Sequence, residues 1–433
     1  MSQTFTIKTL GCKVNQYESE AIAWQLKQNG FKSSNRDSAC AIINTCTVTQ
    51  KAGMQSRQLI RQTIRKNPDA LIIVTGCHAQ INANEILDIK GVHWIVGHAL
   101  KHHLPQRILD HKFSQKPDCP EICVSDILHH RIYNHIPFDS LQTRSRPMVK
   151  IQDGCNAFCS YCIVPYARGP SRSLPENHVV DMVKRFRDHG YKEIILTGIH
   201  LGMYGHDFQP PIQLSHLLKR LIQIPECPRI RLSSIEPLEI TEELIQIIQN
   251  SNKMCHHLHI PLQSGDDETL KQMNRHYTQD FFKDLIYRIK ECIPDMAIGI
   301  DILTGFPEET HQAFENTLHL LERLPATYFH VFPFSMREGT QIAKNRVSLD
   351  VQTIKSRAKI IRELGEQKRK EFLYSSIGQK QWVIIESSDQ TYSRGLTGNY
   401  IPVKISGVFT KNEIRHVQLQ RVSNTKEMQG QLI

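Results

Sequence analysis

Apolar and polar positions in the first hundred residues form two patterns, short apolar runs and longer amphipathic stretches. The apolar runs lie at residues 4–10, 40–44, 70–74 and 94–96, and helical patterns lie at 18–28 and 51–66. Each run has the length of a buried strand, and strands separated by helices predict a parallel, doubly wound sheet of the α/β class. Residues 101–146 contain several prolines and histidines without sustained periodicity, so we interpret them as a connection.

Six more strand-like segments follow, with helical patterns between most of them. They lie at residues 148–152, 193–197, 229–234, 256–260, 297–303 and 328–332. Six βα units suit a partial parallel barrel, in which the chemistry lies at the carboxyl ends of the strands. A basic helix is expected at 355–370. The short β-rich runs of 371–433, broken by glycines, predict a small β-barrel of a kind often used to hold RNA.

These patterns divide the chain into four parts. We expect an amino-terminal domain at 1–110, a linker at 111–143, a barrel core at 144–371 and a terminal β-barrel at 372–433. No stretch approaches the roughly 18 apolar residues of a membrane span. Charged residues interrupt the first thirty positions, so no apolar signal core is present. We therefore expect a soluble, cytoplasmic protein that does not bind membranes.

Charge and cysteine content narrow the classes of function. The chain has 53 Lys and Arg against 43 Asp and Glu, a formal net charge of +10, which favours a polyanionic partner such as nucleic acid. It also has 12 cysteines. A cytoplasmic compartment keeps thiols reduced, so these cysteines indicate metal or redox chemistry and not disulfides.

Three cysteines occupy equivalent places in the amino-terminal pattern. Cys12, Cys46 and Cys77 each lie just past the carboxyl end of a predicted strand. Ligands of open parallel sheets bind at that edge, so three thiols from separate repeats can converge there. A single cysteine at such a place is usually a small buried apolar residue. Three at equivalent places favour a three-thiolate site.

A second group of thiols follows the first predicted barrel strand. Cys155, Cys159 and Cys162 have the spacing C-x3-C-x2-C and can wrap one face of a compact iron–sulfur cluster. A cubane with four irons normally takes four thiolates, so three would leave one iron open to another molecule. The spacing differs from the paired C-x2-C of zinc ribbons, which close a tetrahedral shell.

This motif, placed after a strand that opens a partial βα barrel, resembles the radical S-adenosylmethionine superfamily. The resemblance implies that the amino and carboxylate groups of S-adenosylmethionine occupy the open iron. It also implies that the reduced cluster passes one electron to the sulfonium, which releases a 5′-deoxyadenosyl radical.

Further motifs are similar to those of methylthiotransferases. The amino-terminal motifs are residues 9–19 (TLGCKVNQYES), 44–48 (NTCTV) and 75–77 (TGC). The barrel motifs are 162–170 (CIVPYARGP), 196–202 (LTGIHLG), 259–265 (HIPLQSG) and 305–309 (GFPEE). The carboxyl-terminal part resembles the TRAM RNA-binding domain, so the resemblance covers essentially the whole chain.

Residues 11–18 (GCKVNQYE) look most like the branch that acts on N6-threonylcarbamoyladenosine beside the tRNA anticodon. The isopentenyladenosine branch tends to have glutamine and methionine in place of Lys13 and Val14, and the ribosomal-protein branch has a proline before its lysine. The resemblance thus implies methylthio addition to C2 of that nucleoside. A methylthiotransferase for isopentenyladenosine or a ribosomal-protein side chain stays open as an alternative. So does a non-catalytic iron–sulfur RNA-binding protein.

The family resemblance also implies the cofactors and partners. Two [4Fe–4S] clusters are expected, a radical-generating one on Cys155, Cys159 and Cys162 and an auxiliary one on Cys12, Cys46 and Cys77. The adenine C2–H is inert to ordinary acid–base chemistry, so a radical must remove this hydrogen. The auxiliary cluster would carry the sulfur that the resulting substrate radical captures. S-adenosylmethionine, a tRNA substrate, an electron donor and a sulfur donor complete the set; both donors are unidentified.

Further site residues are predicted at strand ends and on basic surfaces. For S-adenosylmethionine we predict contacts from Thr197, Gly198, Glu236 and Gln263. For RNA we predict Arg57, Arg61 and Arg65, which recur every four residues on one helix, and Arg394, Tyr400 and Lys404 in the terminal barrel. Solvated helix faces carry similar rows of arginine. Six cysteines stay without a role: Cys40, Cys119, Cys123, Cys227, Cys255 and Cys292.

Overall fold

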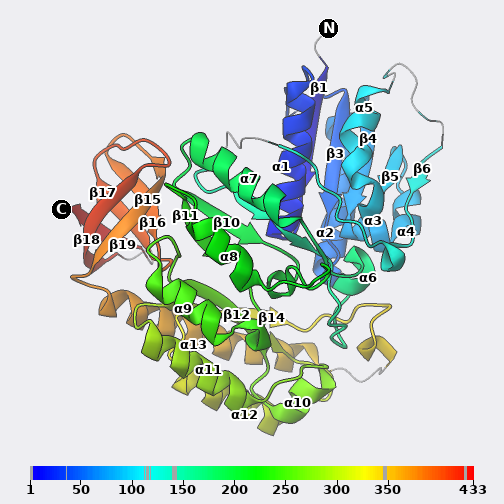
Figure 1. Cartoon of the computed structure of the whole chain (residues 1–433). Helices are drawn as coiled ribbons and strands as arrows, with labels where there is room; N and C mark the ends of the chain where they lie inside the picture. The colour runs from blue at the N-terminus through cyan, green and yellow to red at the C-terminus, as the bar shows by residue number, and fades with distance from the viewer. Residues whose placement is uncertain are drawn as a thin grey trace. The chain divides into compact units, whose positions relative to one another are not determined.

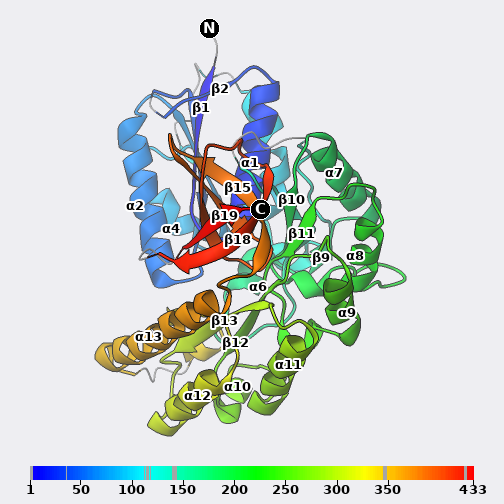
Figure 2. The ribbon, with the colours of Figure 1, turned by 90° about the vertical axis from the view of Figure 1, so that its left-hand side faces the viewer.

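The computed structural model describes residues 3–35, 37–111, 113, 117, 119–138, 144–344, 349–423 and 427–433 (Figures 1 and 2). The chain divides into two compact units. The first comprises Met1–Leu141, Lys150–Leu174 and Ser335–Lys344, and the second comprises Gln142–Val149, Pro175–Phe334 and Asn345–Ile433. The boundary that the sequence suggests at residue 143 lies outside the described residues. Within the described ranges, none of the helices combines the length and apolarity that a bilayer crossing demands.

The first unit contains a six-stranded parallel sheet with the order β2-β1-β3-β4-β5-β6. Its strands are β1 (Thr4–Thr9), β2 (Lys32–Ser33), β3 (Cys40–Thr45), β4 (Leu71–Gly76), β5 (Trp94–Val96) and β6 (Glu121–Cys123). Its helices are α1 (Lys13–Gln28), α2 (Gln50–Lys66), α3 (Cys77–Ile81), α4 (Ala83–Leu87) and α5 (Leu104–Leu109). Every residue of β3 and β4 is buried, as expected for central strands covered on both faces. The doubly wound α/β prediction is confirmed.

One strand of this sheet lies in the region that we interpreted as a connection. β6 has only three residues and pairs with β5 at the edge of the sheet. Its sequence Glu121-Ile122-Cys123 is too short to show a periodicity. A short edge strand of this kind forms because a neighbouring strand offers backbone hydrogen bonds, and not because its own sequence contains an apolar run.

Six barrel strands form two sheets, in the orders β11-β10-β7 and β12-β13-β14, and the pairs β10–β11, β12–β13 and β13–β14 are parallel. They are β7 (Met148–Lys150), β10 (Glu193–Thr197), β11 (Arg229–Leu232), β12 (His257–Gln263), β13 (Ala297–Thr304) and β14 (Tyr328–Pro333). Isolated bridges join Ile230 to Met254 and Ser234 to His259, so the β11 and β12 regions are neighbours. All six predicted strands are present, as a partial barrel with one weakly paired seam.

Helices follow most of these strands, as the βα pattern predicts (Figure 1). They are α7 (Glu176–Asp188), α8 (Leu214–Ile222), α9 (Glu242–Asn250), α10 (Asp267–Gln272), α11 (Gln279–Cys292) and α12 (His311–Arg323). Several begin at a side-chain cap. Thr241, Thr278 and Thr310 each accept a hydrogen bond from a backbone N–H of the first turn, which satisfies a donor that the helix itself leaves unpaired.

The basic helix α13 (Val351–Ser375) is longer than predicted, because Asp350 caps it by accepting from the N–H groups of Gln352 and Thr353. A closed barrel with the order β15-β16-β17-β19-β18 follows. Its strands are β15 (Lys380–Ser388), β16 (Tyr392–Thr397), β17 (Pro402–Ser406), β18 (Ile414–Val422) and β19 (Met428–Leu432). Its interior is aliphatic, and the predicted terminal β-barrel is confirmed.

Candidate active site

Cys12, Cys46 and Cys77 follow β1, β3 and β4, which are adjacent in the sheet. Cys12 precedes α1 as its N-cap and is exposed, whereas Cys46 and Cys77 are buried. The three thiols act on one another electrostatically: Cys12 contributes to the pKa of both other cysteines, and Cys46 contributes to that of Cys77. The structure therefore brings the three predicted ligands into one neighbourhood.

Two glycines let these loops approach one another. Gly11 has φ +97°, and a Cβ there would lie 2.9 Å from the Cys46 sulfur. Gly76 has φ +98°, and a Cβ there would lie 2.4 Å from the carbonyl oxygen of Thr45. Asn15 ties the same loops together, because its amide donates to the carbonyl of Thr45 at 3.0 Å. The backbone is thus preset to hold the thiols close together.

Burial governs the protonation of these thiols. It raises the pKa of Cys77 to about 11 and also raises the pKa of Cys46, while the nearby Arg168 guanidinium opposes both increases. A thiol of this kind is a poor ligand while it keeps its proton, since metals bind the thiolate. A cationic metal or cluster would displace the proton, so loading of this site is coupled to proton release.

The second thiol group lies on the loop between β8 (Gln152–Asp153) and α6 (Val164–Arg168), and it belongs to the first unit. Cys155, Cys159 and Cys162 are all half-buried. The N–H of Cys155 donates to the carbonyl of Gly169 at 3.0 Å, and the N–H of Cys162 donates to the carbonyl of Cys159 at 2.9 Å. These bonds fix both ends of the loop, so the three cysteines are presented from a defined backbone.

A buried group of charges connects the two thiol-bearing segments, and we call it the Glu18 network. Its members are Glu18, Lys101, Lys150, Asp153, Arg168 and Arg172. Arg168, six residues after Cys162, donates to Glu18 at 2.6 Å, and Glu18 lies six residues after Cys12. Lys101 donates to Glu18 at 2.6 Å and Lys150 at 3.1 Å. The guanidinium of Arg168 is fully buried.

The Glu18 network holds more positive than negative charge. Four cationic side chains face two carboxylates, and burial makes an unbalanced charge expensive. Burial by itself would raise the pKa of Glu18, but Arg168, Lys101 and Lys150 hold it well below its usual value. Arg168 also acts on Cys12 and Cys77. A cluster bound by thiolates would place these negatively charged ligands next to the surplus and offset part of it.

The spacing of the thiols also bears on the group that they could hold. A single zinc ion with Zn–S bonds of about 2.3 Å keeps its sulfurs roughly 3.8 Å apart. Among the described residues, His259, Asp301 and His330 form the group of possible metal ligands whose ligand atoms all lie within 4.8 Å of one another. The sulfur atoms of neither cysteine triplet all lie within that distance. Wider spacing and three thiols per group fit a multi-iron cluster.

Sequence reasoning missed the cations of the Glu18 network. Lys101, Lys150 and Arg168 lie 83, 132 and 150 residues from Glu18 along the chain. One signal pointed to them. Glu18 shares a helix face with Val14 and Ala21 and is buried with them, and a carboxylate on a buried face needs a cationic partner.

The predicted S-adenosylmethionine contacts lie at strand ends of the second unit. Thr197 ends β10 and is buried, and Gly198 follows it. Glu236 follows β11, and Arg275 donates to it; burial raises the pKa of Glu236 despite that arginine. Gln263 ends β12 with φ +70°, after a register shift in the strand. All four lie at the carboxyl ends of neighbouring barrel strands, where βα barrels place ligands.

The predicted RNA contacts on α2 differ in their availability. Arg61 and Arg65 are exposed, while Arg57 forms an ion pair with Glu85 at 2.7 Å. A paired arginine is held toward its partner and offers less to a phosphate. The structure therefore leaves a row of two exposed arginines where the sequence pattern suggested three.

In the terminal barrel, Arg394 is half-exposed and pairs with Asp389 at 3.2 Å, and Lys404 stands 3.8 Å above the ring of Tyr392. Tyr400 is different. Its ring stacks on His257 with centroids 4.3 Å apart, and the Arg231 guanidinium lies 5.3 Å from its centroid. Tyr400 thus packs against the barrel strands of the second unit.

Comparison with known proteins agrees with this architecture. Residues 149–321 match the family described as "Radical SAM superfamily", and residues 4–97 match "Uncharacterized protein family UPF0004". A solved radical S-adenosylmethionine methyltransferase, TsrM from Kitasatospora setae, has a similar fold, with a TM-score of 0.55 at 16% identity over 77% of this chain and 75% of that chain.

Several relatives match over nearly the full length. The Bacillus subtilis protein named threonylcarbamoyladenosine tRNA methylthiotransferase MtaB is 38% identical, over 93% of this chain and 90% of its own. The protein of that name from Aquifex aeolicus is 36% identical, over 92% and 96%. A Clostridium botulinum tRNA-2-methylthio-N(6)-dimethylallyladenosine synthase is 33% identical, over 91% and 88%. The chain therefore belongs to the methylthiotransferase family of radical S-adenosylmethionine enzymes, whose cofactors are S-adenosylmethionine and [4Fe–4S] clusters.

Proposed function

We propose that this enzyme adds a methylthio group to C2 of N6-threonylcarbamoyladenosine beside the anticodon of tRNA. The observation that carries the proposal is the pair of cysteine triplets in one compact unit, linked by the Glu18 network. The choice of nucleoside is supported by relatives named for it at 38% and 36% identity, against 33% for a relative named for dimethylallyladenosine.

We assign the two cysteine triplets to different clusters. Cys155, Cys159 and Cys162 would hold the radical-generating cluster, and Cys12, Cys46 and Cys77 would hold the auxiliary cluster. When bound, the clusters and S-adenosylmethionine supply the radical and sulfur chemistry that the inert adenine C2–H requires. The protein itself would hold the two cysteine-bearing loops in a fixed geometry and exclude water from the reaction.

The chain's own residues would orient the small-molecule cofactor and the RNA. Thr197, Gly198, Glu236 and Gln263 are assigned to S-adenosylmethionine, since they line neighbouring strand ends. For tRNA we assign Arg61 and Arg65 to phosphate contacts, with Arg57 as a weaker one because Glu85 competes for it.

The parts of the chain would divide the work. Residues 1–110 would hold the auxiliary cluster, 144–371 would form the radical core after a linker at 111–143, and 372–433 would act as a TRAM-like RNA-binding barrel through Arg394 and Lys404. Tyr400 would anchor that barrel to the core, and any stacking on RNA would be secondary. An electron donor and a sulfur donor would act as further partners. The cytoplasm, where tRNA is modified, is the proposed location.

Anaerobic reconstitution followed by nucleoside mass spectrometry tests this function. Wild-type protein with reductant, sulfide and S-adenosylmethionine is expected to convert N6-threonylcarbamoyladenosine in tRNA to its 2-methylthio form. Cys159→Ala is expected to abolish 5′-deoxyadenosine formation. Cys46→Ala is expected to keep reductive cleavage of S-adenosylmethionine and lose methylthio transfer.

Three results would contradict the proposal. The first is methylthio transfer to isopentenyladenosine with none to threonylcarbamoyladenosine. The second is modification of a ribosomal protein instead of tRNA. The third is RNA binding without any cleavage of S-adenosylmethionine, which would indicate a non-catalytic protein.

A further inference from the structure

Three neighbouring strands of the second unit have one apolar and one polar face. The apolar face of β12 and β13 is completely buried and consists of Leu258, Ile260, Leu262, Ile298, Ile300 and Ile302. The alternate positions carry His257 and His259 on β12, Asp301 on β13, and Tyr328 and His330 on β14. The register pairs Asp301 with His330 and with Pro261, two residues after His259, so the polar side chains share a face.

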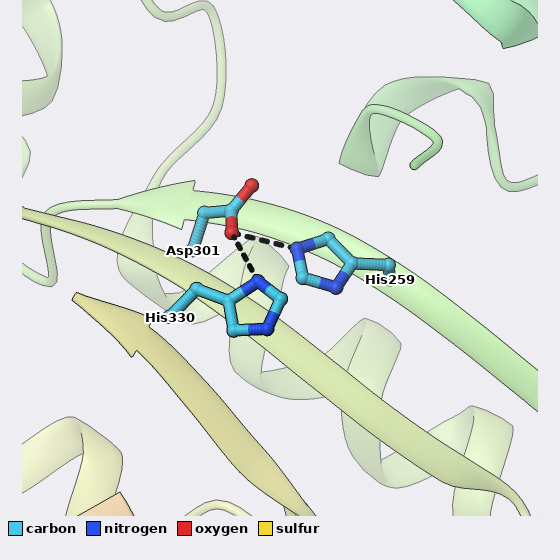
Figure 3. A group of neighbouring side chains, drawn as sticks. All are labelled: His259, Asp301 and His330. Carbon is cyan, nitrogen blue, oxygen red and sulfur yellow. Dashed lines mark hydrogen bonds and ion pairs between the residues drawn. The ribbon is translucent and has the colours of Figure 1, made fainter. Parts of the chain in front are cut away.

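His259, Asp301 and His330 converge on this face, one from each strand (Figure 3). One Asp301 oxygen lies 2.6 Å from Nε2 of His259 and 3.4 Å from Nδ1 of His330. An ionised carboxylate only accepts hydrogen bonds, so both of these ring nitrogens carry a proton. Burial by itself would raise the pKa of Asp301, but the two histidines lower it to about 2, so the carboxylate is ionised at neutral pH.

The two histidines differ in what their other ring nitrogen can do. His259 is 9% exposed, and its Nδ1 lies 3.3 Å from the hydroxyl of Tyr328, so this ring is held on both sides. The side chain of His330 is 55% exposed. Within the described part of the chain, no hydrogen bond or ion pair engages its Nε2. His330 therefore presents a nitrogen to solvent from a ring that Asp301 orients.

Asp301 holds the proton on Nδ1 of His330, so the exposed Nε2 is the ring atom that a ligand can contact. When Nε2 also carries a proton, the ring offers a charge-assisted donor at this position. A charge-assisted donor of this kind selects a carboxylate or another anionic acceptor.

We propose that His330, oriented by Asp301, binds the carboxylate of the threonylcarbamoyl group on the substrate adenosine. This inference rests on the function proposed above and adds the source of its specificity. An isopentenyl group offers no acceptor, so it would leave these polar groups unpaired on binding. The polar face thus discriminates between the two substituted adenosines.

A divalent metal ion is the rival occupant of the same three side chains. Two ligands at about 2.0–2.1 Å from one ion stand roughly 2.9 Å apart at a right angle and 3.3 Å apart in a tetrahedron. The 2.6 Å between Asp301 and His259 is shorter than either. The geometry is that of a direct hydrogen bond, which favours the anion-binding assignment.

The test compares two anticodon stem-loops, one with N6-threonylcarbamoyladenosine and one with its neutral carboxamide analogue. Binding to the reconstituted holoenzyme is measured by fluorescence anisotropy, and turnover is measured by mass spectrometry. His330→Leu is expected to weaken binding of the acid stem-loop and raise its KM by about 10- to 100-fold. The same variant is expected to leave binding of the carboxamide stem-loop within about twofold of wild type.

His330→Gln, which keeps a neutral donor, is expected to fall between wild type and His330→Leu. The control is His319→Leu on α12, whose side chain is 61% exposed, and it is expected to behave as wild type on both stem-loops. Iron content and 5′-deoxyadenosine formation are expected to be unchanged in every variant.

Equal losses on the acid and carboxamide stem-loops would overturn the inference, because they would show a structural role for His330. A stoichiometric divalent ion that is lost with His330→Leu while both clusters stay intact would also overturn it. A failure of the proposed function looks different: wild type itself would not modify the threonylcarbamoyl stem-loop.

Discussion

Glu18→Gln is the substitution that most directly tests the Glu18 network. It keeps the shape of the side chain and removes one negative charge from a buried site. The carboxylate of Glu18 accepts from Arg168 at 2.6 Å, from Lys101 at 2.6 Å and from Lys150 at 3.1 Å. After the change, Asp153 is the single carboxylate of the network, and three of the four cations contact it, namely Lys150, Arg168 and Arg172.

The expected loss of local stability is large because the remaining cations cannot reach water. Breaking a buried ion pair by removing one partner costs about 3–5 kcal/mol. That corresponds to a roughly 100- to 4,000-fold increase in the population of locally opened molecules. The loss is expected in α1, which carries Glu18, and in α6, which carries Arg168, since the network joins these two elements.

Hydrogen exchange measured by mass spectrometry on the apoprotein reports this opening segment by segment. Asp69→Asn is the control, because Asp69 is an exposed carboxyl in the same unit. A double variant, Glu18→Gln with Lys101→Met, also removes one positive charge, so the net charge of the network returns to its wild-type value. This variant is expected to recover part of the protection against hydrogen exchange that Glu18→Gln loses. Exchange in α1 and α6 within about threefold of wild type would refute the reasoning from buried charge.

Three further predictions follow from other features. Burial by itself would raise the pKa of Glu193, but Arg231, Arg229 and Arg146 lower it to about 2, so its contribution to stability is present above its ordinary pKa and is lost as the pH falls toward 2. Urea midpoints of Glu193→Gln should therefore depend less on pH between about 4.5 and 2 than those of wild type, and parallel curves would contradict this. Gly11→Ala forces a Cβ to within 2.9 Å of the Cys46 sulfur at φ +97° and should cost about 1–3 kcal/mol. Its iron content should fall toward that of Cys46→Ala, and full iron loading would show that the loop adapts. Arg61→Ala and Arg65→Ala should each reduce the slope of log affinity for tRNA against log salt by about 0.7–0.9. Arg57→Ala, whose side chain already pairs with Glu85, should reduce it less, and equal slopes for all three would count against that pairing.

Local patterns in the sequence predict the positions of the thiols well. Cys12, Cys46 and Cys77 follow apolar runs whose length marks them as strands, and parallel strands bring such positions to one sheet edge. The loop of Cys155 to Cys162 is defined by its spacing alone. The short edge strand β6 was not predictable, because three residues carry no period.

Contacts between residues far apart in the chain could not be predicted from these local patterns. Lys101, Lys150 and Arg168 reach Glu18 from segments that only the fold brings together, so the pattern around each gives no sign of the others. Tyr400 illustrates the same limit. A tyrosine in a glycine-rich loop of a basic β-barrel is typical of a nucleic-acid contact, yet its ring stacks on His257, 143 residues earlier in the chain. Composition indicates a class of partner, whereas packing decides which side chains remain available to it.

The first unit is assembled from three stretches of chain, and the last of them has a consequence for biosynthesis. Arg337 donates to the hydroxyl of Thr47 at 2.6 Å, and the N–H of Ile342 donates to the carbonyl of Ser160 at 2.8 Å. A ribosome that adds about 5–20 residues per second needs roughly 10–35 s to travel from Cys162 to residue 335. During that interval both cysteine loops have emerged without their closing segment. A cluster delivered to the nascent chain would therefore reach the first unit before residues 335–344 have packed against it. These residues would complete the unit only later in synthesis.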